Sequence, residues 1–589
     1  MTKYLKKFLY IIDDKRSQLL FLICLFLLTS ILEAFGIGLI GPFIALATNL
    51  NLVHQNSKAE WLYTQFNFTS EVDFVVALGL GVVILLWLKS IIGFSVQKYI
   101  FGFGFGCQAD LRTRLMRAYL KVPYTFHLSR NTASLIQNIL NETLVFANGV
   151  LMPTLFGGAN LTIVVALLIL LFITDAVVTG SVFAVLLVVF AFIYQFRRRV
   201  AAWGKQASAA NKKMVQIINH GMGGFKETRV IGCEGYFEQQ LEEQAQRYKQ
   251  VVEKFQAFSL LPRYTLEPVL ISFIIGFTII SLLAQKNINS LTATLGVFAL
   301  ASVRLLPAAS NLMQSYGGIK RSSYVVDLLY KDLKELEEFD RQKQNSVNIP
   351  ELNFDRQLSI ENLNYIYPNA ETTALNDISI SIAKGQSIGL IGKSGAGKTT
   401  IVDIILGLLP IENGDIKVDG VSVKDDLASW QRKVGYIPQS IFLIDDTLER
   451  NIAFGVPDDR IDRHRLEQAI EAAQLTEVIE RLPQGLKTVV GERGVLLSGG
   501  QRQRVGIARA LYHEREVLVL DEATAALDNE TEHLVSKAIE SLSGKKTIII
   551  IAHRLTTVEH CDRIYLMENG RVVKSGSYAE VVLEKSVTG

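Results

Sequence analysis

Six long apolar stretches lie before residue 320, and they constrain the fold more than any other feature of this 589-residue chain. A helix that crosses a membrane needs about 20 mostly apolar residues. Each stretch is long enough, so this part of the chain is predicted to be all-α with six membrane-spanning helices. The predicted spans are Gln18–Ala47, Val72–Ile100, Leu144–Ile173, Ala176–Phe196, Phe255–Leu283 and Leu291–Ser315.

Basic residues gather in the second and fourth connections between these spans. Loops rich in lysine and arginine stay in the cytoplasm. In the other connections only Lys58 and Lys286 are basic. The N-terminus, the second and fourth loops and the C-terminal part of the chain are therefore predicted to be cytoplasmic, with the bilayer as a partner of the chain.

Overall charge and cysteine spacing argue against two other kinds of function. The formal net charge is only +3, so no nucleic-acid partner is expected. The cysteines form neither a CxxC pair nor a metal-ligand spacing, and we expect them to be structural thiols. They are Cys24, Cys107, Cys233 and Cys561.

Charged side chains inside the spans are costly, so their positions are informative. Glu33 lies in the first span, Arg263 and Glu267 lie at the start of the fifth, and Arg304 lies deep in the sixth. Such residues either pair between helices or line a polar cavity for a charged substrate group. Arg304 is the candidate for a substrate-cavity residue.

The sequence changes character after the last span. A charged and polar stretch indicates a linker, and short β-branched runs then alternate with helical patterns. This alternation predicts an α/β domain with a largely parallel sheet, whose buried strands include Ser387–Ile391, Val517–Asp521 and Thr547–Ile551. The predicted organisation is a transmembrane domain over 1–325, a linker over 326–355 and an α/β domain over 356–589.

The sequence GKSGAGKT follows the first of these strands and precedes an apolar helical pattern. It is a complete P-loop in the strand–loop–helix setting that the motif requires. Its backbone N–H groups suit phosphate oxygens, Lys398 would reach the β- and γ-phosphates, and the Thr399 hydroxyl would bind Mg²⁺. The sequence thus predicts a P-loop NTPase domain that binds ATP and Mg²⁺ through Gly392, Lys393, Ser394, Gly395, Ala396, Gly397, Lys398, Thr399 and Thr400.

The strand Val517–Asp521 ends in two carboxylates, Asp521 and Glu522. Two acids at such a strand end can perform two different tasks. Asp521 would hold Mg²⁺ directly or through water, and Glu522 would polarise the water that attacks the γ-phosphate. We therefore expect Glu522 to be a catalytic residue.

The sequence LSGGQ at Leu497–Gln501 makes the C-terminal half resemble the ATPase domain of the ABC transporter family. The resemblance implies that Tyr367 stacks on adenine and that Gln439 senses Mg²⁺ and the membrane domain. It also implies that Asp528 belongs to the D-loop and that His553 contacts the γ-phosphate. Gln439 and His553 are therefore expected to join Glu522 in catalysis.

The same resemblance implies a dimer. In the family, the LSGGQ motif of one subunit covers the γ-phosphate bound by the other. Here Ser498, Gly499, Gly500 and Gln501 would fill that role, and because every ATPase motif is intact, a homodimer is expected.

The membrane half resembles an ABC exporter half-transporter. Val122–Leu135 and Gly223–Phe237 resemble the coupling segments that dock on ATPase domains, and Ile31–Leu46 and Arg304–Pro307 resemble bacterial flippases of lipid-linked oligosaccharides. The resemblance implies ATP-driven flipping of a lipid-linked oligosaccharide or glycolipid across a bacterial inner membrane. The alternatives are export of another lipid, a hydrophobic drug or a peptide, and an ATP-gated channel or regulatory subunit.

Overall fold

The computed structural model describes residues 2–583 apart from 56, 129, 175, 284–287, 345–351, 368–369, 524–528 and 553. The chain divides into two compact units. The first comprises Met1–Val122 and Ser129–Asp340, and the second comprises Pro123–Leu128 and Arg341–Gly589. Helix α15 continues the first unit into the predicted linker and spans Ser323–Gln344.

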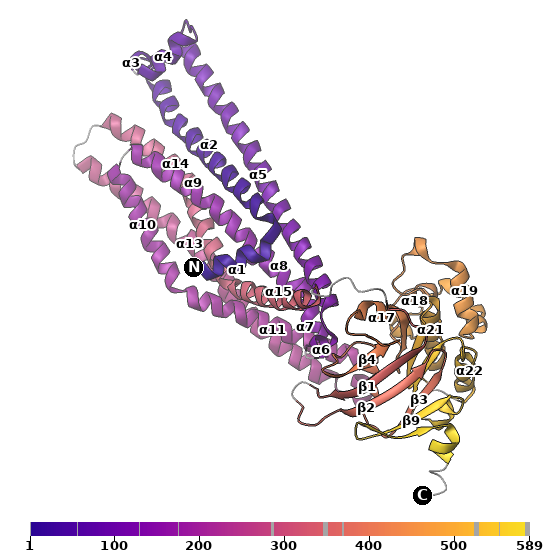
Figure 1. Ribbon diagram of the computed structural model, residues 1–589. Coiled ribbons are helices and arrows are strands. Elements are labelled where there is room, and N and C mark those ends of the chain that lie inside the picture. Colours follow the sequence, from indigo (N-terminus) through magenta and orange to yellow (C-terminus); the bar gives the residue numbers. More distant parts are fainter. Residues whose placement is uncertain are drawn as a thin grey trace. The chain divides into compact units, whose positions relative to one another are not determined.

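The first unit is built of helices (Figure 1), and four of the six predicted spans each lie within a single helix. Among the described residues, three helical stretches are long and apolar enough to cross a membrane, namely Arg16–Thr48, Glu71–Lys121 and Thr132–Thr174. The fold therefore agrees with the predicted all-α membrane domain. The predicted span Leu144–Ile173 also includes most of α8 (Thr143–Phe146) and the π-helical turn Ala147–Leu151, and the span Ala176–Phe196 ends one residue beyond its helix. The main helices of the six spans are α2 (Arg16–Thr48), α5 (Glu71–Lys121), α9 (Met152–Thr174), α10 (Ala176–Gln195), α13 (Glu234–Leu283) and α14 (Ile288–Arg321).

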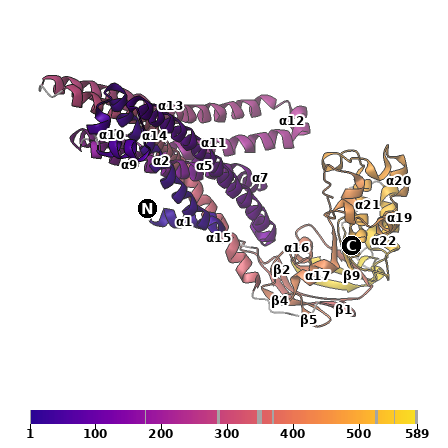
Figure 2. The same ribbon diagram turned by 90° about the horizontal axis from the view of Figure 1, so that it is seen from above.

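Two of these helices are much longer than a membrane is thick. Helices α5 and α13 contain 51 and 50 residues, which at 1.5 Å per residue is about 75 Å against a hydrocarbon core of about 30 Å. Both therefore extend beyond the bilayer into the second and fourth connections between the predicted spans. The short helix α12 (Phe225–Ile231) joins α13 to α11 (Arg197–Gly223), and these form a long hairpin (Figure 2).

Apolar residues from several helices pack at the centre of the first unit. Leu167 and Leu171 of α9 meet Leu266 of α13 and Leu305 of α14 in one buried cluster. Polar contacts reinforce this packing, because the Ser30 hydroxyl of α2 donates to Thr162 Oγ1 of α9 at 2.7 Å. Helices α2, α9 and α14 are thereby held next to one another, and this arrangement brings the charged residues of α2 and α14 together.

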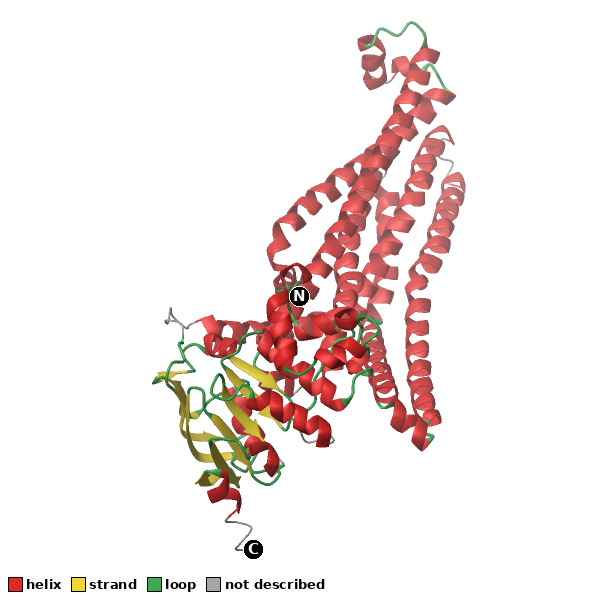
Figure 3. Ribbon diagram, turned by 90° about the vertical axis from the view of Figure 1, so that its right-hand side faces the viewer, coloured by secondary structure: helices red, strands yellow, loops and turns green. Residues whose placement is uncertain are grey.

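The second unit contains two sheets and surrounding helices (Figure 3). The six-stranded sheet has the order β10-β9-β3-β8-β7-β6, and all its pairs are parallel except β10 with β9. The three strands predicted from the sequence are β3, β7 and β8, with the predicted bounds. The other strands are β6 (Val434–Ile437), β9 (Arg563–Glu568) and β10 (Arg571–Gly576).

The central strands of this sheet are buried on both faces. Every residue of β3, β7 and β8 is buried, which explains why these segments are continuous apolar runs rather than alternating ones. Parallel strands end at the same edge of a sheet, so the loops after β3 and β7 come together. The four-stranded sheet has the order β2-β1-β4-β5, with strands β1 (Gln357–Tyr365), β2 (Leu375–Ala383), β4 (Asn413–Val418) and β5 (Val421–Ser422).

Candidate functional site

The P-loop connects β3 to α16 (Lys398–Ile405), and its glycines are required by both backbone conformation and space. Gly392, Gly395 and Gly397 all have positive φ angles, of 152°, 81° and 96°. A Cβ atom on Gly392 would lie 2.2 Å from the Met567 carbonyl oxygen, and one on Gly397 would lie 2.8 Å from a carbonyl oxygen. Only glycine allows the loop to curl over the start of α16, where backbone N–H groups suit an anion.

Lys398 is held by the loop itself. The side chain is buried, and its ammonium donates to the carbonyl oxygens of Gly392 at 2.8 Å and Lys393 at 3.1 Å. Burial lowers the pKa of Lys398, although the charges of Glu522 and Asp521 oppose that shift. The ammonium is thus positioned by neutral acceptors and retains a charge with which to attract phosphate.

The two carboxylates at the end of β7, Asp521 and Glu522, have different partners. The Tyr436 hydroxyl donates to Asp521 Oδ2 at 3.2 Å, and Gln439 Nε2 donates to Glu522 Oε2 at 2.8 Å. Glu522 adopts a φ of 50°, an uncommon conformation for a residue with a side chain. The predicted pair Gln439 and Glu522 therefore meets in the structure, and the backbone after β7 turns sharply to direct the two acids differently.

Asp521 lies near a second acid, Asp403, which is partly buried. Burial raises the pKa of Asp403 in α16 to about 6, and the nearby charge of Asp521 adds to the effect. Burial also raises the pKa of Tyr436, again with a contribution from Asp521. A divalent cation would relieve this concentration of negative charge. The oxygens of Thr399, Asp521 and Gln439 are the type of ligand that Mg²⁺ prefers, so the residues present fit that ion.

The signature motif begins helix α21 (Gly499–Tyr512). Ser498 and Gln501 form a capping box, in which the Ser498 backbone N–H donates to Gln501 Oε1 at 2.8 Å and Gln501 N donates to Ser498 Oγ at 3.3 Å. In the same helix, Gln503 Nε2 donates to the Gln439 carbonyl oxygen at 2.7 Å. The signature helix is therefore tied to the segment that carries Gln439, a link that the sequence analysis did not predict.

Tyr367 lies beside the P-loop helix. Its hydroxyl is 3.2 Å from Thr400 Oγ1, and its ring packs edge-on against Tyr365. This position places an aromatic ring next to the predicted phosphate site. The other two predicted residues, Asp528 and His553, lie outside the described residues.

The membrane unit contains a polar cavity of about 870 Å³ between α2, α5, α9 and α14. Arg304 and Glu33 both line it, and Arg304 Nε lies 3.1 Å from Glu33 Oε1. A second cation, Lys89 of α5, places its ammonium 2.6 Å from Glu33 Oε2. Sequence analysis offered pairing between helices and lining of a cavity as alternatives for these charged residues. In the structure the same side chains do both.

Lys89 was not singled out in the sequence, although a lysine within the apolar run Val72–Ile100 was a visible signal. Arg263 and Glu267, which were singled out, form no ion pair with the residues that the structure describes. The partner of a charge inside a span is therefore set by how helices pack, which single-sequence inspection does not determine.

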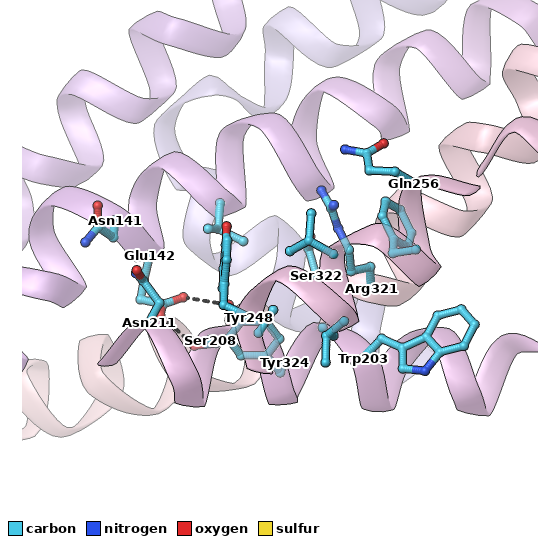
Figure 4. A pocket seen from close by; sticks show the side chains of 16 residues that line it. Asn141, Glu142, Trp203, Ser208, Asn211, Tyr248, Gln256, Arg321, Ser322 and Tyr324 are labelled. Atoms are coloured by element: carbon cyan, nitrogen blue, oxygen red, sulfur yellow. Dashed lines mark hydrogen bonds between the residues drawn. The ribbon is translucent and has the colours of Figure 1, made fainter. Parts of the chain in front are cut away.

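A second cavity of about 240 Å³ lies between α11, an interior part of α13 and the junction of α14 and α15 (Figure 4). Its buried acid, Glu142, accepts hydrogen bonds from the Ser208 and Tyr324 hydroxyls, each at 3.1 Å. The Arg321 guanidinium lies 4.0 Å from the centre of the Phe255 ring. The acid of this cavity already has its partners within the protein, which distinguishes it from the larger cavity.

Comparisons with known proteins agree with this architecture. Residues 375–525 match the family described as ABC transporter, and residues 19–262 match the ABC transporter transmembrane region. A protein of Cupriavidus metallidurans named ATP-dependent lipid A-core flippase is 32% identical over 502 residues, which is 81% of this chain and 80% of that protein. A protein of the same name from Shewanella sp. is 28% identical and covers 99% of this chain and 96% of its own length.

A solved structure extends the comparison to three dimensions. The bacterial Atm1-family ABC exporter with ATP bound superimposes with a TM-score of 0.74 at 22% sequence identity. The match covers 97% of each chain. At that identity the likeness concerns the fold, and it includes both the helical unit and the unit with the sheets.

Proposed function

The chain belongs to the ABC transporter family, and from this premise we propose that it is an ATP-driven flippase of a glycolipid. The observation that carries the proposal is the polar cavity of the membrane unit, where Lys89 and Arg304 lie among apolar helices. Cations and amides in such a place suit a lipid with an anionic sugar head better than a hydrophobic drug. The names of the relatives, lipid A-core flippases, point to the same class of substrate.

In the proposed ATPase cycle, the P-loop holds the phosphates of ATP and Lys398 neutralises part of their charge. Thr399, Asp521 and Gln439 would hold Mg²⁺, and the ion would supply positive charge that stabilises the phosphates. Glu522 accepts a proton from the attacking water, and the Gln439 amide that donates to it keeps the carboxylate in position. Tyr367 stacks on adenine, and Asp528 and His553 complete the site.

The proposed working unit is a homodimer in the inner membrane with its ATPase units in the cytoplasm. Ser498 and the following glycines of one subunit cover the γ-phosphate held by the other. This arrangement makes ATP stabilise the closed dimer, and hydrolysis removes the contacts that favour closure. The segments around α6 (Tyr124–Leu128) and α12 transmit closure to the membrane helices.

The test is ATP-dependent movement of a fluorescent lipid A analogue across the membrane of proteoliposomes that contain the purified full-length protein. Wild-type protein is expected to move the lipid only when ATP is added. Glu522→Gln is expected to bind ATP but to hydrolyse it about a thousandfold more slowly, because the water loses its base. Movement at the wild-type rate in this variant would remove ATP hydrolysis from the mechanism.

A different substrate class would give a different pattern. If the analogue does not move while a neutral hydrophobic drug does, the glycolipid assignment is wrong and the protein is an exporter of another kind. Release of lipid in a burst that needs ATP binding but no turnover would indicate a gated path instead of a pump.

A further inference from the structure

One carboxylate holds both cations of the membrane cavity. Glu33 of α2 contacts Lys89 through Oε2 at 2.6 Å and Arg304 through Oε1 at 3.1 Å. The side chains of Glu33 and Lys89 are each only 10% exposed, whereas the Arg304 side chain is 57% exposed. Lys89 and Glu33 thus form a buried pair, and Arg304 reaches into the open part of the cavity.

The contacts of Arg304 leave most of its donors available. A guanidinium has five N–H donors, and the contact of Arg304 with Glu33 runs through Nε alone without hydrogen-bond geometry, since Glu33 Oε1 accepts no hydrogen bond from the described residues. Within the described part of the chain, no other carboxylate lies within ion-pair distance of Arg304. A phosphate group could therefore take the same cation with better geometry than Glu33, since guanidinium and phosphate bind in a two-pronged arrangement.

The charges of Glu33, Lys89 and Arg304 do not cancel. Two cations face one carboxylate, so the cavity wall of each chain carries one net positive charge. Uncompensated charge is costly inside a membrane, and Glu33 reduces that cost while the cavity holds no anion. Glu33 consequently stands where the anionic group of a substrate would bind.

The rest of the lining is suited to sugars and not to a second ion. Amides can donate and accept hydrogen bonds, as sugar hydroxyls require, and phenyl rings provide apolar surface beside them. Phe101 and Phe156 pack edge to face with ring centres 5.4 Å apart. The amide side chains that line the cavity are Gln97, Asn148, Asn160, Asn311 and Gln314.

We propose that Glu33 is a resident counter-ion that the phosphate of a glycolipid displaces from Arg304, so that Glu33 sets how much negative charge the cavity accepts. The proposal rests on the proposed flippase function and specifies its substrate, a sugar-bearing lipid with one anionic phosphate group for each chain. A lipid with a neutral head leaves Arg304 paired with Glu33 and gains little from the cavity. Removing the charge of Glu33 leaves two uncompensated cations and favours more highly phosphorylated heads.

Direct binding tests the role of Glu33 apart from transport. The full-length protein in nanodiscs is titrated with lipid A bearing two, one or no phosphates, and bound lipid is counted by native mass spectrometry. Glu33→Gln is expected to bind the two-phosphate form roughly tenfold more tightly than wild type, the scale of one hydrogen bond to a charged group. Binding of the phosphate-free form is expected to stay unchanged.

Two control variants sharpen the result. Glu33→Asp keeps the charge and is expected to retain the wild-type order of preference, and Ser90→Ala changes an uncharged residue of the same cavity. If Glu33→Gln and Ser90→Ala show the same preference for phosphate as wild type, the proposal is overturned. If Glu33→Gln does not fold, equal binding of all three lipids by wild type overturns it as well.

The binding and transport experiments separate the two claims. A change in phosphate preference without ATP-driven flipping supports the role of Glu33 and overturns the flippase function. ATP-driven flipping without a change in phosphate preference in Glu33→Gln supports the flippase function and overturns the role of Glu33.

Discussion

Lys398 in the ATPase unit and Lys89 in the membrane unit are both largely buried lysines beside a candidate site, but their partners differ. Lys398 donates to two backbone carbonyl oxygens, whereas Lys89 is paired with the carboxylate of Glu33. The ammonium of Lys398 makes its direct contacts with neutral acceptors, while the acids Glu522 and Asp521 act on it from nearby. A cation inside a membrane span needs a counter-charge while the cavity is empty of anions.

This difference in partners affects ligand binding. A ligand of the ATP site meets a cation whose direct contacts are carbonyl oxygens, while an anionic ligand of the membrane cavity competes with a carboxylate that is already in contact with the cation. Affinity in the ATP site therefore depends on attraction between Lys398 and the phosphates. Selectivity in the membrane cavity depends on whether the anionic group of the ligand can replace Glu33 beside Arg304.

The largest expected effect concerns Lys398, the cation held by backbone carbonyl oxygens. Lys398→Ala removes the positive charge that stabilises the phosphates during hydrolysis, and ATP turnover is expected to fall at least a hundredfold. The measurement is phosphate release at saturating ATP from the full-length protein in nanodiscs. Lys393→Ala is the matched control, because its exposed side chain lies in the same loop and only its backbone carbonyl contacts Lys398. Equal losses in the two variants would refute the role given to Lys398.

Lys89, the cation paired with Glu33, is expected to stabilise the folded protein. Lys89→Met leaves Glu33 with a single, half-exposed cation, so the thermal unfolding midpoint of the purified protein should drop by several degrees. Adding Glu33→Gln removes the stranded charge and should recover most of the loss, a coupling that a double-mutant cycle measures. Lys398→Met is expected to show no comparable rescue by any single carboxylate change. Independent, additive effects at positions 33 and 89 would contradict the pairing.

A smaller effect is expected from Asp403, an acid of the ATPase unit that forms no ion pair with the described residues. Burial raises the pKa of Asp403 to about 6, so the folded state holds its proton more tightly than the unfolded state and loses stability as pH rises from about 4 to above 6. Asp403→Asn removes this loss. The variant should therefore gain more thermal stability over wild type at pH 7.5 than at pH 5.

Fluorescence of Trp430 can follow this change. Trp430 is fully buried, and its indole N–H donates to the Ile405 carbonyl oxygen at the end of the helix that carries Asp403. Replacing the other tryptophans, which all lie before residue 320, isolates its signal. The same gain at both pH values would show that Asp403 does not titrate in this range.

The ATPase unit was the more predictable part of the chain. Its site residues belong to short motifs of consecutive residues. The strands, the P-loop and the pair Asp521 and Glu522 could therefore be located from the sequence around them. The family resemblance indicated that Gln439 and Glu522 belong to the same site, but neither their hydrogen bond nor the one from Gln503 to the Gln439 backbone was predicted. That hydrogen bond joins separate segments and depends on how α21 packs on the sheet.

The membrane unit was predictable in its helices and not in its cavity. Apolar length alone located the spans, and the charge of Arg304 drew attention to it. The role of Lys89 could not be derived, because the residue that faces Glu33 depends on the rotation and register of α5 against α2. The partners of Glu142 in the second cavity were hidden for the same reason, since Ser208 and Tyr324 come from different helices.

The most direct test of the central claim is whether an anionic glycolipid in the membrane cavity controls ATP hydrolysis in the other unit. ATPase activity of the full-length protein in nanodiscs is measured with and without two-phosphate lipid A, for wild type and Arg304→Ala. We expect the lipid to stimulate wild type, and Arg304→Ala to keep its basal rate while needing roughly tenfold more lipid for the same stimulation. Equal stimulation of both proteins at every lipid concentration would contradict the account.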